Sequence, residues 1–81
     1  MKTVVFSTLA ARQFDGLPKA AQIAIENGLD RYAMKGSGDV KTLTGRPGLR
    51  LRIGEYRVIF SEDATTILAI SMGRRTTNTY S

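Results

Sequence analysis

Apolar and polar residues alternate on both sides of the dipeptide Gly54-Glu55, and this is the clearest pattern in the sequence. Residues 49–53 read LRLRI and residues 56–60 read YRVIF. A two-residue loop with glycine first is typical of a type II′ hairpin turn, so we predict a β-hairpin here. The turn implies this register: Ile53 pairs with Tyr56, Arg52 with Arg57, Leu51 with Val58, Arg50 with Ile59, and Leu49 with Phe60.

The predicted hairpin has one apolar face and one basic face, because residues along a strand point alternately to the two sides of the sheet. The apolar face consists of Leu49, Leu51, Ile53, Tyr56, Val58 and Phe60. The other face, here called the arginine face, consists of Arg50, Arg52, Arg57 and Ile59. Arg52 lies directly opposite Arg57, and like charges so placed cost about 0.5 kcal/mol at an exposed site. Because local rules are often broken at functional sites, we interpret the arginine face as an anion-binding surface. The alternative is a solvated face whose arginine stems cover apolar surface.

The first half of the chain predicts a strand followed by two helices. Residues 2–6 (KTVVF) are rich in β-branched side chains, which is typical of a strand. Ser7 or Thr8 then caps a short helix that ends at residues 15–16, and Pro18 begins a second helix that runs to about Met34. The second helix carries an apolar stripe of Ala21, Ile25, Leu29 and Tyr32. Gly28 weakens this helix by about 1 kcal/mol relative to alanine, so we expect close packing at that position.

Residues 66–72 (TILAISM) form an almost continuous apolar run, which is typical of a strand covered on both faces. We place it in the middle of the sheet, between the hairpin and the first strand. Alternation then puts Leu68, Ile70 and Met72 on the helix-covered face, and Ile67, Ala69, Ser71, Gly73 and Arg75 on the other face. The sequence thus predicts one α+β domain, residues 1–81, with the element order β-α-α-β-β-β. Its small, mainly antiparallel, twisted sheet is covered on one face by an N-terminal helical hairpin.

Composition narrows the classes of function. The chain has no cysteine and no histidine, which removes the usual metal ligands and the usual general base, so we expect no metal and no cofactor. Its formal net charge is +5, and residues 41–81 contribute most of the excess. This balance predicts a phosphate-rich or acidic partner. No apolar run approaches the ~20 residues of a membrane span, and no signal peptide opens the chain, so we expect a cytoplasmic protein without a membrane partner.

The ordered set of motifs resembles the RelE/ParE superfamily of bacterial type II toxins, the RelE-like branch in particular. A leucine-containing segment that leads into the hairpin spans residues 43–45, and the R-x-R-x-G-x-Y-R hairpin motif lies within residues 50–60. An apolar strand and a terminal G-x-R…Y follow, the latter as Gly73, Arg75 and Tyr80. The resemblance covers nearly the whole chain.

The resemblance implies a toxin that a small co-expressed antitoxin holds silent in a hetero-oligomer. RelE-like toxins enter the ribosomal A site and cut mRNA, because the 2′-hydroxyl of the RNA attacks the adjacent phosphate and leaves a 2′,3′-cyclic phosphate. ParE-like toxins instead inhibit DNA gyrase and cleave nothing. A third alternative is a non-toxic module that keeps the fold and the antitoxin-binding surface.

Residues of this chain match the family's catalytic positions in part. Arg57 and Arg75 would stabilise the anionic phosphorane, and Tyr80 would stack on a base or accept the 2′-hydroxyl proton. We expect Arg52, Arg57 and Arg75 to meet over one concavity. The further substrate-binding candidates are Lys41, Arg46, Arg50, Arg52 and Arg74.

The match to the family is incomplete, and alternatives remain for several residues. RelE-like nucleases commonly carry lysines at the positions of Gly48 and Arg50. Arginine cannot be deprotonated, so proton transfer would fall to Lys41 or Tyr80.

Other interpretations are open as well. Arg57 could pair with Glu55 or Glu62, and Tyr80 could be structural or contact the antitoxin. Lys41 and Arg46 could be ordinary surface charges, and Arg74 is expected to point away from Arg75 toward a partner.

Overall fold

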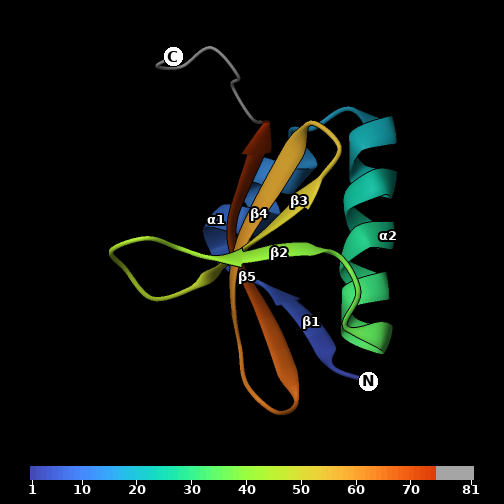
Figure 1. Ribbon diagram of the computed structural model, residues 1–81. Coiled ribbons are helices and arrows are strands. Elements are labelled where there is room, and N and C mark those ends of the chain that lie inside the picture. Colours follow the sequence, from blue (N-terminus) through green and yellow to red (C-terminus); the bar gives the residue numbers. More distant parts are fainter. Residues whose placement is uncertain (75–81) are drawn as a thin grey trace.

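A computed structural model describes residues 1–74, which form a five-stranded sheet and two helices (Figure 1). The elements in chain order are β1 (Thr3–Phe6), α1 (Thr8–Asp15), α2 (Lys19–Lys35), β2 (Asp39–Thr42), β3 (Leu49–Ile53), β4 (Tyr56–Glu62) and β5 (Thr66–Arg74). The strand order is β1-β5-β4-β3-β2, with β1 parallel to β5 and every other pair antiparallel. The α+β class and the central position of the last strand are therefore confirmed. The edge strand β2 was not predicted.

The hairpin formed by β3 and β4 has the predicted register throughout, including the Arg52–Arg57 pair. Gly54 has a φ of +58°, whereas Glu55 does not have a positive φ. A type II′ turn requires this combination, because only its first central residue has a positive φ. Leu51, Val58 and Phe60 are fully buried on the predicted apolar face.

The two helices begin and end close to the predicted residues. The Ser7 hydroxyl accepts a hydrogen bond from the Ala10 N–H at 3.0 Å and so caps α1. Helix α2 follows Pro18 and ends at Gly36, whose φ of +70° is the left-handed conformation of a glycine cap. The buried residues of α2 are Ala21, Ile25, Leu29 and Ala33. Tyr32, predicted on this stripe, is half-buried at its margin and stacks edge-to-face on Phe60.

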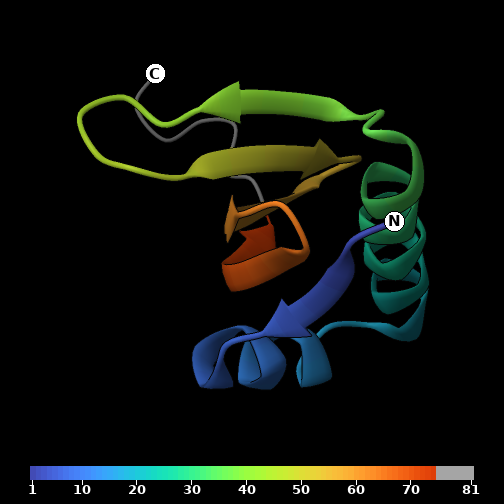
Figure 2. The ribbon, with the colours of Figure 1, turned by 90° about the horizontal axis from the view of Figure 1, so that it is seen from below.

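Figures 1 and 2 show that α2 runs along one face of the sheet, whereas α1 lies beside β1 and β5. The core lies between the helices and the sheet and is closed by the buried side chains of β3, β4 and β5. The opposite face of the sheet carries no helix of residues 1–74. None of the helices in this described part is long and apolar enough to cross a membrane.

Where β1 ends, α1 and its N-cap lie along the edge of β5 and form hydrogen bonds with it. The last pair between the two strands is Phe6 with Ala69. Beyond it, the Ser7 hydroxyl donates to the carbonyl of Ile70 at 2.7 Å, and the Met72 N–H donates to Oε1 of Gln13 at 2.7 Å. The N-cap and one side chain of α1 thus satisfy backbone groups that no strand of residues 1–74 pairs on this side.

The faces predicted for β5 are wrong in its first half and right in its second half. Ile67 and Ala69 are fully buried in the core, whereas Leu68 and Ile70 are 37% and 39% exposed. The reason is a bulge: Ile59 lies opposite Ser71 and Phe60 opposite Ala69, so Ile70 has no partner on β4. One extra residue reverses the alternation. After the bulge, Met72 lies in the core and Ser71 and Gly73 lie on the other face, as predicted.

Candidate functional site

The face of the sheet away from α2 carries two rows of residues that lie side by side across four strands. The first row is Asp39, Arg52, Arg57 and Gly73, and the second is Lys41, Arg50, Ile59 and Ser71. We call these eight residues the open face. Each row places two cations directly opposite one another, Arg52 against Arg57 and Lys41 against Arg50. Such pairs repel, so the face has an unbalanced positive potential that favours an anionic ligand.

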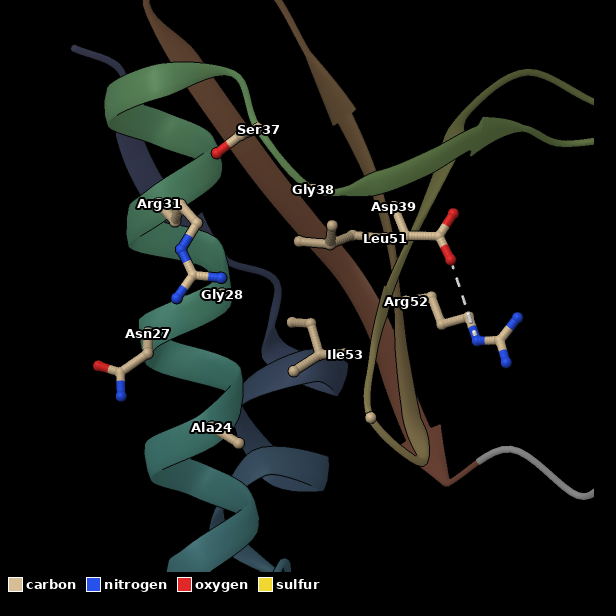
Figure 3. A pocket seen from close by; sticks show the side chains of 11 residues that line it. Ala24, Asn27, Gly28, Arg31, Ser37, Gly38, Asp39, Leu51, Arg52 and Ile53 are labelled. Carbon is tan, nitrogen blue, oxygen red and sulfur yellow. Dashed lines mark ion pairs between the residues drawn. The ribbon is translucent and has the colours of Figure 1, made fainter.

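Asp39 is the single carboxylate in these rows, and it lies next to Arg52 (Figure 3). Its Oδ2 is 4.0 Å from Nε of Arg52, and the two side chains are about half exposed, at 51% and 46%. An exposed ion pair at this distance contributes at most about 1 kcal/mol. Arg52 is thus partly neutralised by the protein itself and does not line the concavity described below.

Within the described part of the chain, Arg57 has no such partner. Glu55, one of its two candidate partners, binds Arg74 with an Oε1–Nη2 distance of 2.5 Å. Glu62, the other, accepts hydrogen bonds from Nζ of Lys2 at 2.7 Å and from the hydroxyl of Tyr32 at 2.6 Å. Within residues 1–74, Arg57 makes no ion pair. The guanidinium is exposed and remains available to an external anion.

A concavity of about 260 Å³ lies over the β4 and β5 ends of both rows. It is lined by Gln13, Arg46, Arg57, Ile59, Ser71, Met72 and Gly73, and none of these described residues is acidic. Gln13 reaches it because α1 lies beside β5, with its Oε1 held by the Met72 N–H. Alternation along β5 predicted that Ser71 lies on this face of the sheet. No pattern in the sequence marked Gln13, because only the packing of α1 against β5 brings it to the concavity.

Arg50 contributes a second feature of the open face. It is half-buried, and its Nε is buried without a hydrogen-bond partner among the described residues. A buried donor without a partner is costly, and an anion or a carbonyl oxygen would satisfy it. Arg50 lies between Lys41 and Ile59 in the second row, and its charge adds to the positive potential of the open face.

The remaining candidates lie elsewhere. Arg74 pairs in register with Tyr56, on the side of the sheet opposite to Arg57, and binds Glu55. Arg75 and Tyr80 lie outside the described residues. Gly48, at a position where RelE-like nucleases commonly carry lysine, has a φ of +119° that strains any other residue. A lysine at this position would therefore require a different backbone conformation.

The sheet order and the helix positions define the fold of RelE-like toxins, and the resemblance seen in the motifs is confirmed at the level of structure. The chain is similar to RelBE2, a toxin–antitoxin complex of Mycobacterium tuberculosis, with 26% identity and a TM-score of 0.75 over 91% of this chain and 98% of that one. The isolated E. coli RelE toxin gives 15% identity and a TM-score of 0.79 over 95% and 87% of the two chains. A RelE–RelB complex of Pyrococcus horikoshii gives 24% identity and a TM-score of 0.76 over 91% and 94%. No family model and no curated protein matches the sequence.

Proposed function

We propose that this protein is the toxin component of a type II toxin–antitoxin system and acts in the cytoplasm as a ribosome-dependent, metal-independent mRNA endonuclease. The observation that carries the proposal is Arg57, an exposed cation without an ion pair among residues 1–74, at a concavity that it shares with Arg46. The fold shared with RelE toxins supports the toxin role.

The proposed reaction needs fixed positive charge more than it needs a metal. The 2′-hydroxyl of the RNA attacks the adjacent phosphorus, the 5′-oxygen of the next nucleotide leaves, and a 2′,3′-cyclic phosphate remains. Arg57, together with Arg75, stabilises the anionic phosphorane between these states. Because the chain has no histidine, Tyr80 or Lys41 is left to transfer the protons. Arg46 and Arg50 bind flanking phosphates of the mRNA.

A small antitoxin is the proposed protein partner. Several toxins with this fold were crystallised as complexes with their antitoxins. An acidic antitoxin segment on the open face would neutralise the same cations that bind mRNA, and the toxin would then be silent. Co-expression with the neighbouring reading frame should yield a hetero-oligomer and restore growth.

A gyrase inhibitor of the ParE type is the second candidate. The observation that favours it is the absence of lysine at positions 48 and 50, where Gly48 and Arg50 cannot transfer a proton. It predicts an SOS response and gyrase-linked DNA breaks with intact mRNA.

Replacing Arg57 tests the nuclease proposal. Wild type, Arg57→Ala and a control, Arg31→Ala on the exposed side of α2, are induced in cells, and the 5′ ends of transcripts are mapped by primer extension. We expect cleavage of translated messages by wild type and control. Arg57→Ala should cut about 100-fold more slowly, the usual cost of one lost group that stabilises a transition-state anion. Intact messages in growth-arrested cells would contradict the proposal, and normal growth would point to the non-toxic module.

A further inference from the structure

Gly73 is a glycine that the fold itself does not require. It lies inside β5, where glycine weakens a strand and often marks a site that a ligand approaches closely. Its φ is not positive, so another residue could adopt the same backbone conformation. Apart from its chain neighbours Met72 and Arg74, a Cβ added at Gly73 would meet no heavy atom of residues 1–74 within 4 Å. Gly28 is the opposite case, because a Cβ there would lie 2.6 Å from Cδ1 of Ile53.

The space above Gly73 is the concavity of the candidate site. Gly73 lies directly opposite Arg57 and lines the concavity together with Gln13, Arg46 and Ser71. The side chain that Gly73 lacks would therefore enter the volume beside the guanidinium of Arg57, which makes no ion pair within residues 1–74.

We propose that Gly73 keeps the floor of this concavity open so that a phosphodiester of single-stranded RNA can approach the sheet beside Arg57. This inference rests on the proposed nuclease function and states how its substrate is seated. The lining offers guanidinium, amide and hydroxyl groups and no carboxylate among the described residues, which is the chemistry of a phosphate site. The volume of 260 Å³ is below the ~300–1,000 Å³ of sites that enclose a whole small molecule, so it suits one segment of a longer chain.

Two substitutions of different size test the role of Gly73. Gly73→Ala adds one methyl group to the floor, and Gly73→Val adds a branched side chain that strands favour. The matched control is Ser61→Val, on an exposed position of β4 outside the concavity. Each purified variant is measured in three ways: thermal unfolding, anisotropy of a short fluorescent single-stranded RNA, and mRNA cleavage on translating ribosomes in a cell-free system.

We expect both Gly73 variants to unfold at the wild-type temperature or above it. Gly73→Val should bind the RNA about tenfold more weakly, a loss of ~1.4 kcal/mol, and should lose cleavage to at least the same degree. Gly73→Ala should show a smaller loss of affinity, and Ser61→Val should behave as wild type.

Other results would overturn the inference, and they differ from those that overturn the function. If Gly73→Val is folded, and if it binds and cleaves RNA as wild type does, only the inference about Gly73 is overturned. The inference is also overturned if both Gly73 variants unfold at a lower temperature than wild type, because glycine would then be needed for the stability of the fold. A fluorescent glutamate-rich peptide is titrated in the same anisotropy assay. If Gly73→Val binds RNA as wild type does and loses affinity only for this peptide, the concavity holds an acidic protein segment and the inference is overturned. Wild type that neither binds nor cuts RNA would overturn the proposed function, and the inference with it.

Discussion

Arg52 and Arg57 are neighbours across the hairpin, but their guanidinium groups have different electrostatic surroundings. Both side chains are exposed on the open face, and each lies opposite the other. The difference comes from the strands on their outer sides: Arg52 adjoins Asp39 of β2, whereas Arg57 adjoins Gly73 of β5. Among residues 1–74, the carboxylate beside Arg52 and the open space beside Arg57 therefore leave the Arg57 guanidinium more available to a ligand.

Removing the Asp39 charge should strengthen binding of single-stranded RNA. Asp39→Asn frees Arg52 from an exposed ion pair of ~0.2–1 kcal/mol, so we expect affinity to rise up to about fivefold. The salt dependence of binding should also become steeper, because one more cation engages a phosphate. The control is Asp30→Asn on the exposed side of α2, which changes the net charge equally. Equal affinities of the two variants in an anisotropy titration would show that Asp39 has no specific effect on the face.

At the scale of elements, α2 is held against the hairpin at one close approach. Gly28 of α2 faces Ile53 at the end of β3, and the two are in the same cleft between helix and sheet (Figure 3). Glycine in the middle of a helix lowers stability by about 1 kcal/mol relative to alanine. The close approach explains why it is tolerated, because a Cβ would lie 2.6 Å and 2.8 Å from two atoms of Ile53.

We expect Gly28→Ala to lower the free energy of unfolding by about 1 kcal/mol in urea titrations. The overpacking cost of ~1–3 kcal/mol exceeds the gain in helix propensity. Ile53→Val removes the nearer of the two atoms, so the double variant should be more stable than the sum of the single changes predicts. The control Asn27→Ala, exposed on the same helix, should stabilise slightly. Additive effects at positions 28 and 53 would contradict the close contact.

At the scale of the whole molecule, one hydrogen-bonded cluster joins the N-terminus, α2 and β4. Glu62 accepts hydrogen bonds from Lys2 and Tyr32, which lie 60 and 30 residues away in the chain. The bond from Lys2, followed by the bond from Tyr32, lowers the pKa of Glu62 below its ordinary value of 4.5. Burial, followed by the hydrogen bond to Glu62, raises the pKa of Tyr32 to about 12.

This cluster should make stability depend on pH in the acid range. Because the folded pKa of Glu62 is lowered, its contribution is present above pH 4.5 and is lost as the pH falls through the folded pKa. Glu62→Gln should cost about 1–2 kcal/mol at pH 7 and should flatten the acid limb of a stability–pH profile. Glu26→Gln, on an exposed position of α2, is the control. Acid limbs of equal slope in wild type and Glu62→Gln would exclude this role for the cluster.

Much of the fold follows from local pattern. Features that depend on residues within one or two elements could be predicted from alternation and glycine placement. They are the register of the hairpin, the type II′ turn, the cap at Ser7 and the buried stripe of α2. The edge strand β2 was not predictable, because its sequence DVKT has little alternation of its own and becomes a strand by pairing with β3. The cross-strand pair with Arg52 and the resemblance predict Arg57 as a site residue, whereas its lack of an ion pair within residues 1–74 follows from how Glu55 and Glu62 are packed.

The sequence by itself determined which residues are basic and on which face of the hairpin they lie, since side-chain direction in a strand depends only on position. Tertiary structure decided which of these cations is neutralised, because strand order places Asp39 beside Arg52, whereas packing pairs Glu62 with Lys2 and not with Arg57. It also decided the orientation of Leu68 and Ile70, because the bulge in β5 depends on neighbours that are distant in the chain. The concavity likewise exists only because α1 takes the place of β1 beside β5 and brings Gln13 close to Arg57 and Gly73.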